Sequence, residues 1–153
     1  AYEGFTYSHA SIMHNVLEYN KEAKLVQVGV RDYSKGEKER MDSDPRITTF
    51  FDADLKDAQL SGTSWDRQVD KTLYELPSRV YISFDADGLT PDLCPATGTP
   101  VPGGLSFDQV NYLLVKLKES GKEVIGFDLS EVGNGQWDGI VGARLLYKLC
   151  GLF

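Results

Sequence analysis

The chain has 153 residues, the size of one domain with a single hydrophobic core, and we expect residues 1–153 to form one domain. Its 41% hydrophobic and 25% charged residues are ordinary for a globular protein, and no apolar run is long enough to cross a bilayer, which excludes a membrane-spanning role. The net charge of −7 argues against a nucleic-acid-binding role and favours cationic small molecules as partners.

The expected elements alternate between helices and strands along the chain. Ser8 can cap a helix over residues 9–20, and further helices are expected over residues 34–44, 66–76, 106–120 and 138–149. Short apolar, β-branched or aromatic stretches predict strands at residues 24–30, 46–51, 79–84 and 123–129. This alternation predicts an α/β fold in three layers, with helices on both faces of a parallel sheet.

The strand expected over residues 79–84 delivers two aspartates, Asp85 and Asp87. Side chains alternate along a strand, so we expect both carboxylates on one side, where they repel each other unless a cation or a shared proton intervenes. Taken alone, such a pair more often serves in turns and caps than in metal binding. The glycines and prolines that follow, over residues 88–104, predict a long, stiff loop at the strand end, where α/β sheets place their sites.

Two other expected strands also end in polar residues. Arg31 and Asp32 follow the strand over residues 24–30, and Asp128 and Glu131 lie at the end of the strand over residues 123–129. The ends of parallel strands share one edge of a sheet, so these clusters are expected to converge with the aspartate pair. From the residues alone, helix capping and loop hydrogen bonding explain Asp128 and Glu131 equally well.

Residues 85–105 strongly resemble a signature of the ureohydrolase family, which comprises the arginases, agmatinases and their relatives. The resemblance rests on the aspartate pair, the Thr-Gly-Thr-Pro run at residues 97–100 and the Gly-Gly-Leu close at 103–105. Asp128-x-x-Glu131 resembles the second signature of the family, in which Asp128 would support the site. The resemblance implies Mn²⁺-dependent hydrolysis of a guanidino C–N bond, giving urea and an amine. The segment before His9 lacks the Ser-Gly-Asn pattern of arginases, which favours an agmatinase-like enzyme with a small guanidino substrate.

The resemblance also implies roles for individual residues. Asp85 would bridge two Mn²⁺ ions and Asp87 would bind one of them, because carboxylate oxygens suit this hard ion. Glu131 would bind the substrate guanidinium, and Thr99 would support the carboxylates. His9 would pass a proton to the departing amine, although a lone histidine at a helix start is more often a cap or a surface group.

The binuclear site of the family also needs ligands from a Gly-Gly-Asp-His segment and an Asp-Ala-His-x-Asp segment, and this sequence contains neither. We therefore expect a chain truncated at its amino terminus, unable to hold two metals by itself and exposing sheet surface. Cys94 and Cys150 match no metal or redox spacing, which indicates free thiols in a reducing cytoplasm. The complete form is expected to be a homo-oligomer. Arginase activity, formimidoylglutamase activity and a non-catalytic remnant that serves as an interaction module remain as alternatives.

Overall fold

The computed structural model describes residues 4–153. Its strands are β1 (Leu25–Val30), β2 (Ile47–Phe51), β3 (Arg79–Asp85) and β4 (Glu123–Ser130). Each lies within one residue of the bounds expected from the sequence at either end, so the strand predictions are confirmed. Short apolar stretches bounded by polar and turn residues were sufficient to find them.

The helices are α1 (Ile12–Tyr19), α2 (Lys35–Ser43), α3 (Asp52–Leu60), α4 (Trp65–Glu75), α5 (Phe107–Glu119) and α6 (Gln136–Cys150), with 3₁₀ turns η1 (His9–Ser11) and η2 (Ala86–Gly88). Serine side chains cap three of the expected helices: Ser34, Ser64 and Ser106 each accept a hydrogen bond from a backbone N–H three residues on. The helix expected from residue 9 is confirmed with its first turn in the tighter 3₁₀ form.

Helix α3 was not expected from the sequence. It starts at Asp52, immediately after β2, so no turn residues separate the two elements. Only Asp52 and Leu55 are buried along it, which leaves no strong apolar stripe for a periodicity argument to detect. Asp52 and Asp54 lie in its first turn, where negative charge is favourable.

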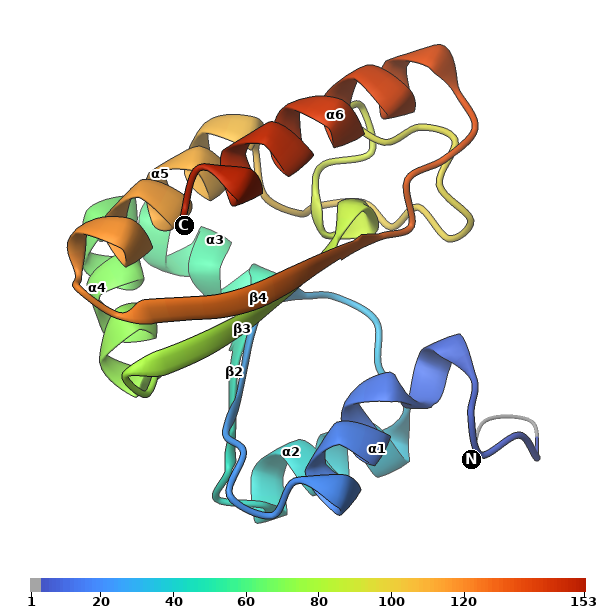
Figure 1. Cartoon of the computed structure of the whole chain (residues 1–153), viewed down its shortest axis with the longest axis vertical. Coiled ribbons are helices and arrows are strands. Elements are labelled where there is room, and N and C mark those ends of the chain that lie inside the picture. Colours follow the sequence, from blue (N-terminus) through green and yellow to red (C-terminus); the bar gives the residue numbers. More distant parts are fainter. Residues whose placement is uncertain (1–3) are drawn as a thin grey trace.

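The strands pair in parallel as two separate ladders, β1 with β2 and β3 with β4 (Figure 1). The α/β class and the parallel pairing expected from the sequence are confirmed, but within residues 4–153 no strand pairing joins the two ladders into one sheet. Figure 1 shows the β1–β2 ladder running down towards α1 and α2, while the β3–β4 ladder lies beneath α5 and α6. The carboxyl end of β1 meets the loop that follows η2, where a β-carbon at Gly29 would lie 3.5 Å from Leu105 Cγ.

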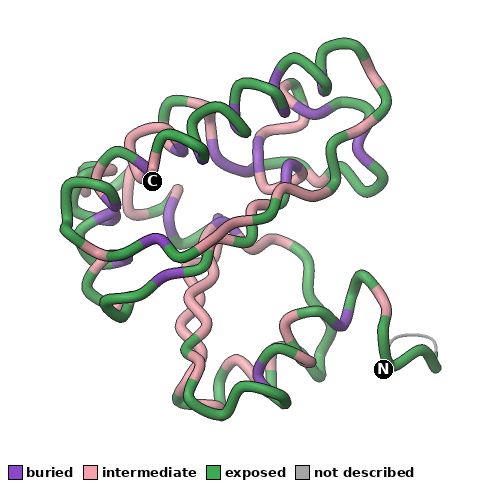
Figure 2. The backbone as a smooth tube through the Cα atoms, viewed as in Figure 1, coloured by how far each residue is buried: buried purple, intermediate pink, exposed green. Residues whose placement is uncertain are grey.

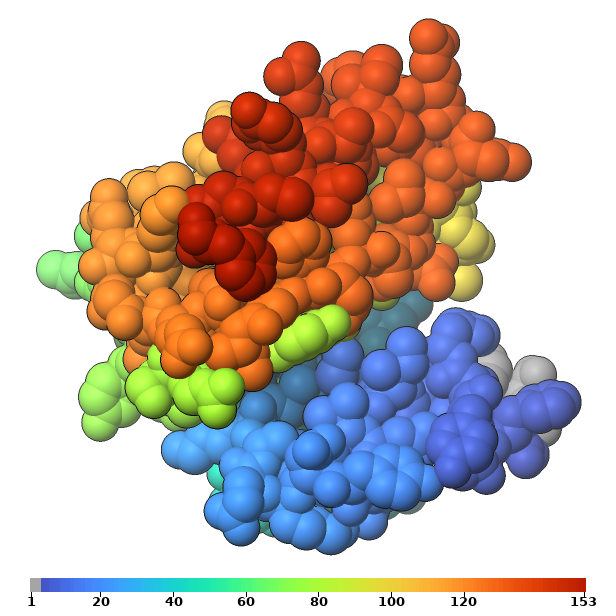
Figure 3. All heavy atoms as spheres, in the orientation of Figure 1, coloured from blue at the N-terminus to red at the C-terminus, as the bar shows by residue number. Residues whose placement is uncertain are grey.

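The hydrophobic core lies between the β3–β4 ladder and the helices above it, in the upper part of Figure 2. Its buried residues come from α3, the loop after η2, α5 and α6: Leu55, Leu89, Cys94, Leu105, Val110, Leu114, Val141, Leu145 and Leu149. The opposite face of this ladder is exposed at Tyr81 and Ile125. Residues of β1 and β2 are mostly half-buried, and Figure 3 shows the amino-terminal part meeting the carboxyl-terminal part along an indented line.

Two tryptophans tie elements together. The indole of Trp65 in α4 donates a 3.0 Å hydrogen bond to the carbonyl of Gln109 in α5, and that of Trp137 in α6 donates one of the same length to the carbonyl of Asp92. Cys94 is buried and Cys150 exposed, and both are free thiols as expected. No helix in the described part of the chain is both long enough and apolar enough to span a membrane.

Candidate active site

The aspartate pair lies where β3 gives way to a 3₁₀ turn. β3 ends at Asp85, and Asp87 belongs to η2, so alternation along a strand does not apply to this pair and that part of the sequence argument is wrong. The turn itself brings the two residues together, because the backbone N–H of Asp87 donates a 3.1 Å hydrogen bond to Asp85 Oδ1. The carboxyl groups are neighbours through turn geometry rather than strand geometry.

The surroundings of Asp85 raise the pKa of its carboxyl from 3.8 to about 6. The largest cause is desolvation by the protein atoms packed around the group, although the residue keeps a solvent-exposed side. The negative charge of Asp87 acts next in the same direction, and that of Glu131 adds to it, while the hydrogen bond from the Asp87 N–H opposes them. Three carboxyl groups therefore crowd one place, as expected of a site that attracts a cation.

The loop over residues 88–105 is closed at its base. Leu89 and Leu105 form a parallel bridge, in which the Leu105 N–H donates to the Gly88 carbonyl at 3.0 Å. Gly104 has a φ of 94°, and a β-carbon there would lie 2.5 Å from the Leu89 carbonyl oxygen, so only glycine permits this approach. Within the loop, the Thr99 hydroxyl donates a 3.3 Å hydrogen bond to Asp87 Oδ2.

Glu131 follows β4 directly and has a φ of 55°, an uncommon backbone conformation for a residue other than glycine. The Thr97 hydroxyl donates a 2.9 Å hydrogen bond to the Glu131 carbonyl, which ties this residue to the 88–105 loop. A β-carbon at Gly98 would lie 3.6 Å from Glu131 Oε2, so the carboxylate reaches over the loop. The Thr-Gly-Thr run thus touches both Asp87 and Glu131.

Asp138 is a supporting residue that the sequence argument treated only as a helix start. It is 2% exposed, and its Oδ1 accepts a 2.9 Å hydrogen bond from the Ala96 N–H. A β-carbon at Gly133 would lie 2.3 Å from the Ala96 carbonyl and 2.7 Å from Asp138 Oδ1. Two glycines, Gly133 and Gly135, just before a helix that has an aspartate in its first turn, were the available signal for this packing.

Arg31 brings the end of β1 to the same place. Its guanidinium donates to the carbonyls of Asp87 and Gly88, the latter at 3.4 Å, and to the Gly29 carbonyl at 3.0 Å. The expected convergence of strand ends is therefore found for Arg31, the aspartate pair and Glu131. Asp32 follows Arg31 in the sequence and is exposed.

Asp128 and His9 are the two remaining site residues expected from the sequence. Asp128 faces Ser83 across the β3–β4 ladder, and its Oδ1 accepts a 3.0 Å hydrogen bond from the Ser83 hydroxyl, two residue pairs before the strand end at Asp85. His9 is the first residue of η1, the 3₁₀ turn that leads into α1.

The model of the arginase family matches residues 1–150. The chain belongs to the arginase family. It is 37% identical to the N(1)-aminopropylagmatine ureohydrolase of Thermus thermophilus over 99% of this chain and 48% of that protein, and 32% identical to the agmatinase of Pyrococcus horikoshii over 99% and 50%. The crystal structure of the agmatine ureohydrolase of Thermoplasma volcanium superposes with a TM-score of 0.77 at 27% identity, covering 99% of this chain and 50% of that one. The chain spans about half the length of these relatives.

The described residues of this arginase-family chain provide part of the ligand set that a metal ion needs. Asp85 and Asp87 offer adjacent carboxylates of the kind that hard divalent cations prefer, and desolvation together with the negative charge of Asp87 raises the pKa of Asp85. Within residues 4–153, however, no three histidine, cysteine or acidic side chains are arranged so that they could hold a metal ion. The described residues supply two ligands and leave the coordination of an ion incomplete.

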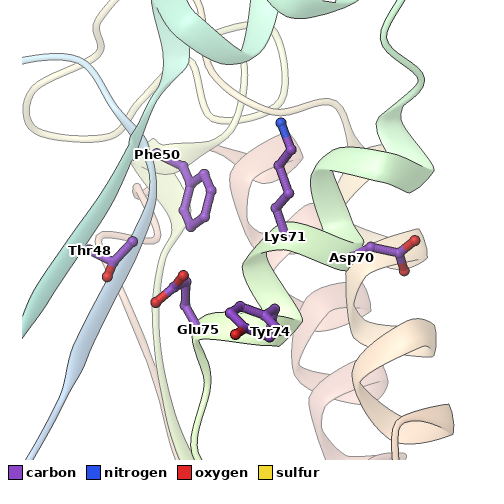
Figure 4. A pocket seen from close by; sticks show the side chains of 6 residues that line it. All are labelled: Thr48, Phe50, Asp70, Lys71, Tyr74 and Glu75. Carbon is purple, nitrogen blue, oxygen red and sulfur yellow. The ribbon is translucent and has the colours of Figure 1, made fainter.

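A cavity of about 450 Å³ lies elsewhere in this arginase-family chain, between β2 and α4 (Figure 4). Figure 4 shows Phe50 and Thr48 of β2 facing side chains of α4, with Lys71 and Glu75 beside the ring of Phe50. None of its lining residues belongs to the carboxylate cluster. The candidate active site therefore lies at the carboxyl ends of β3 and β4 and not in this cavity.

Proposed function

We propose that this chain supplies the acidic part of a Mn²⁺-dependent ureohydrolase, which hydrolyses a guanidino C–N bond to urea and an amine. The observation that carries the proposal is the gathering of Asp85, Asp87 and Glu131 around one rigid loop, in a chain of the arginase family. The remaining metal ligands would come from the part of the relatives' length that this chain does not span. Residues 1–153 are taken as one domain of that enzyme.

Each acidic residue has a separate task in this proposal. Asp85 would bridge two Mn²⁺ ions and Asp87 would bind one, with Thr99 holding the Asp87 carboxylate through its 3.3 Å hydrogen bond. Bound Mn²⁺ ions supply a hydroxide near neutral pH by lowering the pKa of water. Glu131 would hold the planar guanidinium through charge-assisted hydrogen bonds, which orient the substrate carbon without removing a proton from it.

Asp128 and His9 keep supporting roles. Asp128 would stabilise the end of β3 through its hydrogen bond with Ser83. His9 would donate a proton to the departing amine, because an imidazole titrates near neutrality.

The substrate is proposed to be agmatine or a related guanidino compound that lacks an amino-acid end. The support is the absence of the Ser-Gly-Asn pattern before His9 and the names of two relatives, an N(1)-aminopropylagmatine ureohydrolase and an agmatinase. Arginine and formimidoylglutamate are the alternative substrates. We place the complete enzyme in the cytoplasm, as a homo-oligomer, with the two free thiols as support for the reducing compartment.

The test joins this chain to the amino-terminal half of the Thermus thermophilus relative and compares the chimera with the chain alone. We expect two Mn²⁺ ions per chimera and fewer than two per isolated chain, measured by metal analysis after dialysis. The chimera should release urea from agmatine or N(1)-aminopropylagmatine faster than from arginine, and faster than it releases formamide from formimidoylglutamate.

Matched variants of the chimera separate the roles. Asp85→Asn should lose Mn²⁺, whereas Glu131→Gln should keep Mn²⁺ and lose about 10- to 100-fold in kcat/KM, the cost of a hydrogen bond to a charged group. A metal-loaded chimera that hydrolyses none of these substrates would support the non-catalytic remnant. Two tightly held Mn²⁺ ions in the isolated chain would contradict the incomplete site.

A further inference from the structure

The guanidinium of Arg31 donates its hydrogen bonds to main-chain carbonyls and not to acidic side chains. Nη1 donates to the Gly29 carbonyl at 3.0 Å and to the Gly88 carbonyl at 3.4 Å, and Nη2 donates to the Asp87 carbonyl. Among residues 4–153 no aspartate or glutamate lies within ion-pair distance of its guanidinium. One side chain thereby joins the end of β1 to the turn that carries Asp87.

Gly103 and Asp52 hold the aliphatic part of the Arg31 side chain in place. A β-carbon at Gly103 would lie 3.2 Å from Arg31 Cδ and 2.5 Å from Asp52 Oδ2, so Gly103, at a φ of 94°, packs directly against both side chains. Asp52 is 6% exposed, and its Oδ1 lies 3.9 Å from Lys56 Nζ. Arg31 Nε and Asp52 Oδ1 are buried without a hydrogen-bond partner in the described chain, so packing rather than a salt bridge fixes the stem of Arg31.

We propose that Arg31 is a positioning residue, which clamps the η2 turn so that the Asp85 and Asp87 carboxylates stay together and face away from the clamp. The guanidinium binds the backbone of the turn and leaves the carboxylate oxygens available to a divalent cation. An arginine that paired with those carboxylates would compete with the cation. The metal-related part of this inference rests on the proposed function, whereas the clamp itself does not.

Arg46 provides a matched control. It is likewise partly buried and donates to main-chain carbonyls, those of Leu17 at 2.9 Å and Lys21 at 3.4 Å. Unlike Arg31 it also forms an ion pair with Asp44 at 2.6 Å, and it lies at the opposite end of the β1–β2 ladder. A purely structural loss at either arginine would weaken the chain in general. A clamp predicts that each substitution affects its own end of the ladder.

The first experiment measures amide hydrogen exchange by NMR in Arg31→Met, Arg31→Lys and Arg46→Met. In Arg31→Met, the Leu89 and Leu105 amides, which donate to the carbonyls of Ala86 and Gly88, should exchange about 10-fold faster or more, with the Leu25 amide unchanged. Arg46→Met should show the reverse, because Leu25 donates to the Arg46 carbonyl. Lysine keeps the charge but lacks the fork of donors, so Arg31→Lys should fall between wild type and Arg31→Met.

The second experiment titrates Mn²⁺ alone into the same proteins and follows paramagnetic broadening of the amides of residues 85–88. Half-broadening should need about 10-fold more Mn²⁺ in Arg31→Met than in wild type, as for other residues that orient metal ligands, and the same concentration in Arg46→Met. Equal Mn²⁺ dependence in wild type and Arg31→Met would overturn the role in metal binding.

Unchanged exchange at Leu89 and Leu105 in both Arg31 variants would overturn the clamp. If Arg31→Met does not fold, Arg31→Lys decides: exchange at wild-type rates at both amides would refute the clamp, and selective acceleration there would support it. Absence of broadening by Mn²⁺ in wild type would overturn the metal-related part of this inference; the Mn²⁺ content of the chimera judges the proposed function, and the exchange result judges the clamp by itself.

Discussion

Asp85 and Asp87 are two acids placed where each makes ionisation of the other less favourable. The turn forces them together, desolvation raises the pKa of Asp85 to about 6, and Glu131 adds a third negative charge. Such an arrangement costs stability at neutral pH, and the cation of the proposed function would relieve this cost.

The first prediction concerns titration of Asp85 in the metal-free chain. Its carboxyl carbon should titrate by NMR with a midpoint near 6. Asp87→Asn should lower that midpoint by removing the like charge, yet leave it above 3.8 because desolvation is the larger cause. Asp128→Asn, which alters a neighbour on the same ladder, should leave the midpoint unchanged, and an Asp85 midpoint below 4 in wild type would contradict the crowding.

The same pKa sets the sign of a stability change. The folded pKa of about 6 lies above the ordinary 3.8, so between these values the folded chain binds more protons than the unfolded chain. The free energy of unfolding should therefore fall as the pH rises from 3.8 to 6, and Asp85→Asn should remove that decline. Urea unfolding of wild type and variant across this range provides the measurement.

Helix α6 connects the core to Glu131 through its glycines. A β-carbon at Gly142 would lie 2.9 Å from Val132 Cγ1, next to Glu131, whereas one at Gly139 would meet nothing within 4 Å. The helix therefore packs tightly against Val132 at Gly142, whereas at Gly139 there is room for a side chain. The tight glycine lets the residue after Glu131 lie directly on the helix.

The second prediction compares alanine at these two glycines. Gly142→Ala should lower the free energy of unfolding by about 1–3 kcal/mol, because the new methyl group displaces the short, stiff side chain of Val132. Gly139→Ala should raise it by up to about 1 kcal/mol, the usual gain of alanine over glycine in a helix. Equal effects of the two substitutions in urea unfolding would show that α6 does not pack against Val132 as described.

The sequence was informative at the scale of elements and less so at the scale of contacts. Strands and capped helices follow from local composition, so they could be predicted within about one turn. Helix α3 could not, because it lacks a turn before it and a clear apolar stripe. The contacts of Arg31 with residues 87 and 88 join positions more than 50 residues apart, and no local pattern encodes them.

The aspartate pair and Asp138 show the same limit. The aspartate pair was found by resemblance, but its geometry depends on a 3₁₀ turn that strand periodicity did not anticipate. Asp138 was read only as a helix start, although its buried carboxylate holds the Ala96 amide. Buried hydrogen bonds between distant segments require tertiary structure to be seen.

At the scale of the whole molecule, the two ladders leave sheet surface open. The face of the β3–β4 ladder opposite the core exposes 56% of Tyr81 and 46% of Ile125, and the cavity between β2 and α4 adds further uncovered surface. Exposed strands and apolar patches of this kind favour pairing with another chain.

The third prediction is that the 153-residue chain associates with itself at concentrations on the order of 10–1,000 µM, as measured by light scattering after size exclusion. Replacing both Tyr81 and Ile125 by lysine should weaken the association, because charge on this face opposes contact between copies. Tyr147→Lys, on the outer surface of α6, should not. A monomer at all these concentrations, with a single cooperative melting transition, would contradict the prediction.

The two tryptophans allow the intrinsic fluorescence of the chain to report on two different parts of the structure. Trp65 packs against the core and Trp137 holds the carbonyl of Asp92 in the 88–105 loop, so their fluorescence reports on different places. With Trp65 replaced by phenylalanine, the remaining emission follows the loop beside the carboxylates. With Trp137 replaced, it follows unfolding of the core, and ligand binding can be told apart from loss of structure without any added label.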